Sequence, residues 1–227
     1  MGKGILHAWN VSPQEAVRIQ TRLRDRVSLS PSGKRIGRVG GGDVSYAKGD
    51  DRLFGVMVVL SVPDLKLVDQ AWEMGQVGFP YVPGLLSFRE CPILLETARK
   101  IRTPPDVWIF DGQGIAHPRG LGLASHMGLL LDCPSIGCAK KRLTGVHNRV
   151  GPERGARQNL RIDDRVVGAV LRTRDQTKPV YVSPGFRINL EEAVDIVLKT
   201  GRGYRLPEPL RQAHLLSNQI RKQESGS

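Results

Sequence analysis

The segment 106–110 reads Asp-Val-Trp-Ile-Phe and runs directly into a second acid, Asp111. Four consecutive apolar residues without polar alternation are typical of a strand that is covered on both faces, as the central strands of α/β sheets are. We therefore expect an α/β protein with this segment in the middle of its sheet.

Other patterns place helices and strands around this segment. Ser12, Pro13 and Glu15 form a capped helix start. Pro92 would remove a backbone donor inside the stretch 84–101, so we expect a short turn to Cys91 and a helix that begins at Pro92. Further strands are expected at 43–47, from 53, from 65, at 134–139, 165–173 and 178–185, a basic loop at 140–161, and further helices at 120–131, 189–199 and 209–222. This order predicts a mixed central sheet flanked by helices.

The chain length sets the expected number of domains. A chain of 227 residues can bury one sizeable core, and we favour a single domain over 1–220 rather than two small ones. The polar end 221–227, Arg-Lys-Gln-Glu-Ser-Gly-Ser, is expected to be disordered.

The chain carries an excess of positive charge. Its 34 Lys and Arg outnumber its 22 Asp and Glu, which gives a net charge of +12 and a pI near 10.1. This imbalance favours a polyanionic partner such as nucleic acid, although a generally basic surface on a soluble protein would give the same composition.

Sequence features relevant to localisation favour the cytoplasm. No apolar run approaches the roughly 20 residues that span a bilayer, and the first residues lack the apolar core of a signal peptide. The three cysteines are odd in number and form no Cys-x-x-Cys pair, as expected for reduced thiols. We expect a cytoplasmic protein without a membrane partner.

Several common sites are excluded by their spacing. The segment 111–117 has His117 where a dinucleotide-binding fingerprint needs its third glycine, and 137–142 lacks the spacing of a phosphate-binding loop. No His-Glu-x-x-His pattern or Cys/His cluster offers a zinc site. Neither a nucleotide cofactor nor zinc is expected.

Two carboxylates stand at the ends of predicted strands. Asp43 follows three glycines, and Asp111 ends the apolar segment and is followed by Gly112 and Gly114. A carboxylate at the end of a buried strand is costly unless a cation compensates it, and Mg²⁺ binds carboxylates together with water and phosphate oxygens. The glycines would let a nucleic-acid backbone or base approach closely. Asp43 and Asp111 are therefore candidate metal ligands with room for a substrate beside them.

Each candidate also has a purely structural interpretation. These interpretations are turns at strand ends for Asp43 and Asp111, a surface ion pair with Arg89 for Glu90, core packing for His117 and His126, and a helix surface for His214. They are less convincing together than singly, because these residues and Lys140 lie among glycine-rich loops in a basic chain.

Four blocks of the sequence resemble a known family. They are Gly-Gly-Asp-Val-Ser-Tyr-Ala at 41–47, Pro-Tyr-Val-Pro-Gly-Leu-Leu-Ser-Phe-Arg-Glu at 80–90, the long block 110–143, and Pro-Leu-Arg-Gln-Ala-His-Leu-Leu at 209–216. The blocks closely resemble the signature motifs of the endonuclease V family, the deoxyinosine 3′ endonucleases, from the first helix to about His214. No departure within them suggests an inactive member.

The resemblance implies a ribonuclease H-like fold and a metal-dependent nuclease. It implies a Mg²⁺ site at Asp43 and Asp111, with Mn²⁺ as a substitute, supported by Glu90 and His214. Lys140 would contact a phosphate or orient the nucleophile. His214 is expected to position water or lie outside the ligand shell, because Mg²⁺ prefers oxygen. The family nicks DNA at the second phosphodiester bond 3′ to the deaminated base and leaves 3′-hydroxyl and 5′-phosphate ends.

The resemblance also suggests how the base is selected. Pro80 and Pro83 stiffen the loop around Tyr81, whose ring would then wedge into the stack where a base has been extruded. A packed turn aromatic is the alternative for Tyr81. The flipped hypoxanthine would enter a pocket expected to be lined by Gly84, Leu86, Gly112, Gly114 and His117.

Other function classes remain open. A different ribonuclease H-like nuclease, such as a junction resolvase or an inosine-RNA-specific enzyme, would share the acids. A resolvase, however, would not need the Tyr81 loop. A non-catalytic RNA-binding protein would explain the charge but not the acids. The expected partners are double- and single-stranded DNA containing deoxyinosine, with inosine-containing RNA as an alternative, bound by a monomer.

Overall fold

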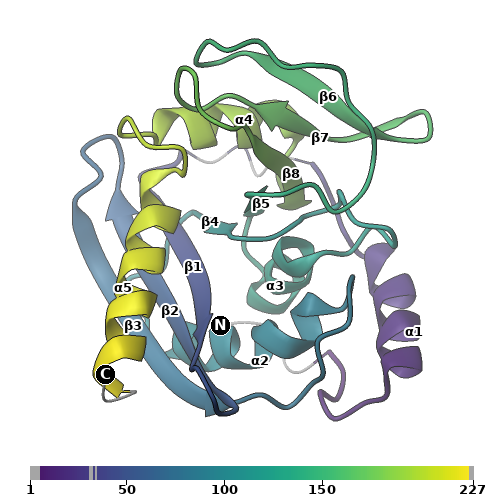
Figure 1. Ribbon diagram of the computed structural model, residues 1–227, viewed down its shortest axis with the longest axis vertical. Coiled ribbons are helices and arrows are strands. Elements are labelled where there is room, and N and C mark those ends of the chain that lie inside the picture. The colour runs from purple at the N-terminus through teal and green to yellow at the C-terminus, as the bar shows by residue number, and fades with distance from the viewer. Residues whose placement is uncertain (1–5, 31–32, 34, 225–227) are drawn as a thin grey trace.

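One mixed sheet forms the centre of the molecule. The computed structural model describes residues 6–30, 33 and 35–224, and within them the sheet has eight strands in the order β3-β2-β1-β4-β5-β8-β7-β6 (Figure 1). The strands are β1 (Arg38–Tyr46), β2 (Arg52–Ser61), β3 (Leu67–Gln76), β4 (Val107–Phe110), β5 (Ser135–Ala139), β6 (Arg157–Ile162), β7 (Arg165–Leu171) and β8 (Val180–Phe186). Strands β1, β4 and β5 are parallel, and all other neighbouring pairs are antiparallel. The expected α/β fold with a mixed, ribonuclease H-like sheet is confirmed.

Helices cover both faces of this sheet. They are α1 (Pro13–Arg24), α2 (Leu86–Arg99), α3 (Leu123–Leu131), α4 (Leu190–Lys199) and α5 (Glu208–Glu224). Val107 and Ile109 of β4 pack in the cluster that contains α4 and the start of α5, whereas Trp108 and Phe110 pack against α2 and α3. The apolar run of β4 is therefore explained by burial on both faces. None of the described helices is long and apolar enough to cross a membrane.

Strand β1 begins earlier than expected and includes Gly40, Gly41 and Gly42. A Cβ on Gly41 would overlap the carbonyl oxygen of Pro209, which lies at the start of α5. The glycines are therefore strand residues that let a helix lie directly on the strand, and the expected boundary at Asp43 was wrong for this reason.

Helix α2 is continuous through Pro92, which contradicts the expected turn to Cys91. Proline forfeits one helical hydrogen bond, but Phe88, Cys91 and Leu94 are fully buried on the packed face of the helix. Tertiary packing therefore outweighs the local cost. As a result Glu90 lies inside a helix instead of in a turn.

Other boundaries also differ. The helix expected at 120–131 begins at Leu123, because Gly120 has a φ of +71°. The expected loop 140–161 ends in strand β6. Helix α5 extends through Glu224, so 221–224 of the expected disordered tail are helical, and 225–227 lie outside the described residues. The helix capped by Asn189 and the pairing of β7 with β8 are confirmed.

Candidate active site

Three neighbouring parallel strands deliver Asp43, Asp111 and Lys140 to one place. Gly42 of β1 pairs with Phe110 of β4, so the acids that follow these residues lie side by side. Lys140 directly follows β5, and its Nζ lies 2.5 Å from Oδ2 of Asp111. Burial raises the pKa of Asp111, although the charge of Lys140 opposes this shift. The two acids predicted from the sequence are therefore brought together with a cation.

Glu90 of α2 adds a third carboxyl group to this cluster. Its side chain is buried, and the Tyr46 hydroxyl donates a hydrogen bond of 2.9 Å to its Oε1. The pKa of Glu90 is raised to about 8, mainly by burial and in addition by the negative charges of Asp43 and Asp111, while the hydrogen bond from Tyr46 opposes this shift. Three carboxyl groups thus lie close together at this end of the sheet.

Helix α5 contacts the cluster from the other face of the sheet. His214 Nδ1 lies 3.2 Å from Asp43 Oδ2, and this hydrogen bond is the main cause of the raised pKa of His214. Ser217 Oγ donates to the same oxygen at 2.6 Å. Ser217 was missed in the sequence, where the only available signal is its position three residues after His214 on a helix.

The donor set fits a Mg²⁺ ion that a substrate completes. No group of three or more His, Cys, Asp or Glu side chains among the described residues is arranged to hold a metal ion alone. Mg²⁺ commonly binds to one or two carboxylates and takes its remaining ligands from water and phosphate. Asp43 and Asp111 supply such a pair, and the cation would offset the repulsion that raises the pKa of Glu90. The chemistry of the residues present therefore fits the expected ion.

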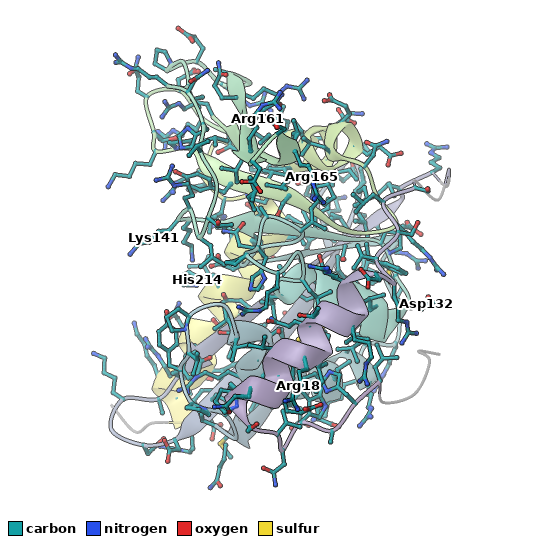
Figure 2. All side chains as sticks on the ribbon, turned by 90° about the vertical axis from the view of Figure 1, so that its right-hand side faces the viewer. Arg18, Asp132, Lys141, Arg161, Arg165 and His214 are labelled. Carbon is teal, nitrogen blue, oxygen red and sulfur yellow. The ribbon has the colours of Figure 1, made fainter. Side chains whose placement is uncertain are left out.

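A cavity of about 360 Å³ opens beside Asp111 and Lys140. Tyr81, 72% exposed, lies at this cavity together with Lys141, which Figure 2 labels near His214. Of the expected pocket residues, the lining includes Tyr81, Pro83, Gly84, Leu86, Gly112 and His117. A larger hollow of about 700 Å³ lies along the edge strand β3 and includes none of Asp43, Glu90 and Asp111, so we assign the chemistry to the smaller cavity.

Two expected pocket residues lie outside its lining. Gly114 packs against the carbonyl oxygen of Pro184 on β8, and its backbone N–H donates to Ser183 Oγ at 2.7 Å. Pro80 is exposed and is likewise not a lining residue. Gly114 therefore serves the packing behind the cavity wall, because a side chain there would collide with β8.

Gly84 is a fixed point of the Tyr81 loop. It has a φ of +79°, and its carbonyl oxygen accepts hydrogen bonds from His117 Nε2 at 2.8 Å, Arg119 at 2.7 Å and Gln20 of α1 at 3.0 Å. Burial lowers the pKa of His117 to about 4, so its neutral ring donates through Nε2 and accepts from the Arg119 N–H through Nδ1. His117 thus lines the cavity mainly by holding Gly84 in place.

Two buried polar atoms at this cavity have no hydrogen-bond partner within the part of the chain that the structure describes. They are Ser87 Oγ and Gln113 Oε1, and the Gln113 side chain is oriented because its Nε2 donates to the Lys141 carbonyl oxygen at 3.0 Å. Buried polar groups are normally satisfied by protein, water or a ligand. A polar ligand in this cavity would therefore find unused hydrogen-bonding capacity.

Comparisons with known proteins identify the family of this chain. The family model described as endonuclease V matches residues 21–215. Endonuclease V of Dictyoglomus thermophilum is 48% identical over 204 residues, which cover 90% of this chain and 89% of the relative. The crystal structure of endonuclease V from Streptomyces avermitilis has a TM-score of 0.91 at 40% identity and covers 96% of both chains.

One similar structure contains nucleic acid. It is Ciona intestinalis endonuclease V in complex with a 24mer DNA containing an inosine followed by a ribo-adenosine, with a TM-score of 0.82 at 28% identity over 93% of this chain and 98% of that one. The fold, the family model and the relatives thus agree along almost the whole length. The chain belongs to the endonuclease V family.

Proposed function

We propose that this protein is a Mg²⁺-dependent endonuclease that recognises deoxyinosine in DNA. It nicks the strand at the second phosphodiester bond 3′ to the deaminated base and leaves 3′-hydroxyl and 5′-phosphate ends. The observation that carries this proposal is the shared cavity: one wall bears Asp111 and Lys140, and another bears the exposed ring of Tyr81. The inosine in the DNA bound to the Ciona relative supports the same substrate class.

The acid cluster supplies the chemistry of strand cleavage. Asp43 and Asp111 would hold Mg²⁺, which polarises a phosphate, lowers the pKa of water and offsets charge on the leaving oxygen when it is bound. Lys140 Nζ offers a positive charge to an entering phosphate oxygen. Before the cation binds, Glu90 can hold a proton near neutral pH because its pKa is raised to about 8, mainly by burial. His214 orients Asp43 through Nδ1.

The cavity supplies the selection of the base. A purine that pairs weakly is extruded at low cost, and the Tyr81 ring can stack on the bases that remain. The anchored carbonyl of Gly84 keeps the cavity in shape before the base arrives, which limits the ordering cost of binding.

A labelled duplex with one deoxyinosine tests the proposal. We expect one Mg²⁺-dependent nick at the second bond 3′ to inosine, none in undamaged duplex, and none with Asp43→Asn or Asp111→Asn at saturating Mg²⁺ because each variant loses a charged ligand. Asp195→Asn, on the exposed surface of α4, is the matched control and should nick normally. Cleavage by either ligand variant at the wild-type rate would refute the metal assignment.

Inosine-containing RNA is the second candidate substrate. The specific reason is the ribo-adenosine that follows inosine in the DNA bound to the Ciona relative. Substrates with deoxyadenosine or adenosine at that single position, compared at equal enzyme concentration, would separate the two preferences.

The same assay separates the other function classes. A resolvase would cut branched DNA without inosine, and a non-catalytic RNA-binding protein would cut none of these substrates. The proposal includes a monomer acting in the cytoplasm, consistent with the absence of a disulfide among the described residues.

A further inference from the structure

Two side chains of helix α5 form hydrogen bonds to the same oxygen of Asp43. Ser217 Oγ lies 2.6 Å and His214 Nδ1 3.2 Å from Oδ2, while no hydrogen bond to Oδ1 is present among the described residues. A carboxylate only accepts hydrogen bonds, so both α5 groups must donate. Charge-assisted bonds of this length are strong enough to fix a side-chain rotation. The carboxylate is therefore held with Oδ2 toward α5 and Oδ1 free.

The serine is more firmly placed than the histidine. Ser217 is fully buried, whereas the side chain of His214 is 45% exposed. The backbone carbonyl of Ser217 accepts a hydrogen bond from Ser45 Oγ at 2.9 Å, which ties this turn of α5 to β1. The start of α5 also lies directly on Gly41 of the same strand. Two points of contact thus hold the Ser217 hydroxyl against Asp43.

The exposed histidine also has a second partner. Asn218 Nδ2 lies 3.2 Å from His214 Nε2, and the same amide donates to the His214 carbonyl oxygen at 2.8 Å. The ring is therefore held at both nitrogens, which keeps Nδ1 toward Asp43. Two positions of α5, 214 and 217, therefore act on Asp43 directly, and position 218 acts on it through His214.

We propose that Ser217 is a positioning residue that presents Asp43 Oδ1 to the divalent cation. The inference rests on the proposed function, because it concerns the cation which that function requires. Partners of metal-ligating groups typically change metal affinity by about 10- to 100-fold when they are removed. Without the Ser217 hydroxyl, the carboxylate is free to rotate and must be ordered again when the cation binds.

Metal affinity of the purified full chain provides the test. Mn²⁺ binding is measured by electron paramagnetic resonance without nucleic acid, for wild type, Ser217→Ala and Ser135→Ala. Ser135→Ala is the matched control, because it also removes a buried serine hydroxyl. Ser135 lies at the start of β5, the end of that strand away from Lys140, and its hydroxyl donates to the Ala124 carbonyl oxygen. We expect Ser217→Ala to bind Mn²⁺ about 10- to 100-fold more weakly and Ser135→Ala to bind it as wild type does.

Two further measurements separate positioning from folding. Nicking by Ser217→Ala should need about 10- to 100-fold more metal and approach the wild-type rate at saturation, while its binding to inosine duplex in EDTA should equal that of wild type. Wild-type Mn²⁺ affinity in Ser217→Ala, or equal weakening in Ser135→Ala, overturns the inference. A wild-type protein that binds no Mn²⁺ overturns the metal assignment and the inference together. A wild-type protein that binds Mn²⁺ but does not nick inosine duplex overturns only the proposed activity.

Discussion

Tyr81 distinguishes a base-selecting enzyme from a generic metal nuclease. Its ring is 72% exposed, which is unusual for a packed aromatic and suits a group that meets its partner only in a complex. We expect Tyr81→Ala to weaken binding to inosine duplex by about 1 to 3 kcal/mol, the usual value of a base–aromatic stack. Tyr81→Phe should retain most of the affinity, because stacking needs the ring alone. Equilibrium binding to inosine duplex and undamaged duplex measures the effect.

Tyr204 offers a matched control for that substitution. It is also exposed, at 49%, but it stacks on Arg211 outside the cavity. Tyr204→Ala should leave inosine selectivity unchanged. The defect of Tyr81→Ala should shrink on single-stranded inosine DNA, where no base pair must be opened. Unchanged duplex selectivity in Tyr81→Ala would mean that the ring is only a loop residue.

At the residue scale, the sequence predicts some of the site and misses the rest for a physical reason. Asp43 and Asp111 stand out because acids are unusual at the ends of buried strands. Glu90, Lys140 and His214 were also candidates, but their roles came from the family resemblance, since a local pattern does not show which distant positions meet and His214 is 171 residues from Asp43. Ser217 has no motif, because a buried serine is recognised only by its partner.

At the scale of elements, the close contact between β1 and α5 controls the geometry of the site. We expect Gly41→Ala to destabilise the fold by about 1 to 3 kcal/mol, the usual cost of overpacking, because its Cβ would overlap the Pro209 carbonyl oxygen. Urea unfolding followed by circular dichroism measures this change. Mn²⁺ affinity should fall as well, since α5 carries the groups that hold Asp43.

Gly37 provides the control for this substitution. A Cβ there would lie 3.7 Å from Asp106, an ordinary van der Waals distance. Gly37→Ala should therefore change the free energy of unfolding much less than Gly41→Ala. Equal stabilities of the two variants would show that α5 can move away from β1 without cost.

Agreement between local pattern and tertiary packing separates the elements that the sequence predicts well from those that it does not. Strand β4 is predicted by its run of apolar residues, and helix α4 is predicted by its capping residues. In both cases the local pattern and the tertiary structure agree. The glycines of β1 and Pro92 of α2 were misread as loop or boundary signals. Glycine is normally unfavourable inside a strand and proline inside a helix, but packing against a neighbouring helix outweighs these preferences here. A short window of sequence does not show which helix will be the neighbour.

At the scale of the whole molecule, positive charge is unevenly distributed along the chain. Residues 140–178 hold eleven Lys and Arg but four Asp and Glu, so they carry +7 of the net +12. This segment begins at Lys140 beside Asp111 and continues through the cavity rim to the β6–β7 end of the sheet (Figure 1). A phosphate backbone that enters the site would meet most of the excess charge on this side.

Salt dependence tests this arrangement. The slope of log affinity against log salt for undamaged duplex should be steep, because each neutralised phosphate contributes a slope of about −0.9. Lys141→Ala should reduce the slope by about 1, since this lysine lines the cavity rim and its side chain has no ion-pair partner among the described residues. Lys66→Ala removes an exposed lysine beside the edge strand β3, at the opposite end of the sheet, and should leave the slope unchanged. Inosine selectivity should persist in both variants, because phosphate contacts carry no base information. Equal slopes for wild type and Lys141→Ala would show that the nucleic acid takes another path across the protein.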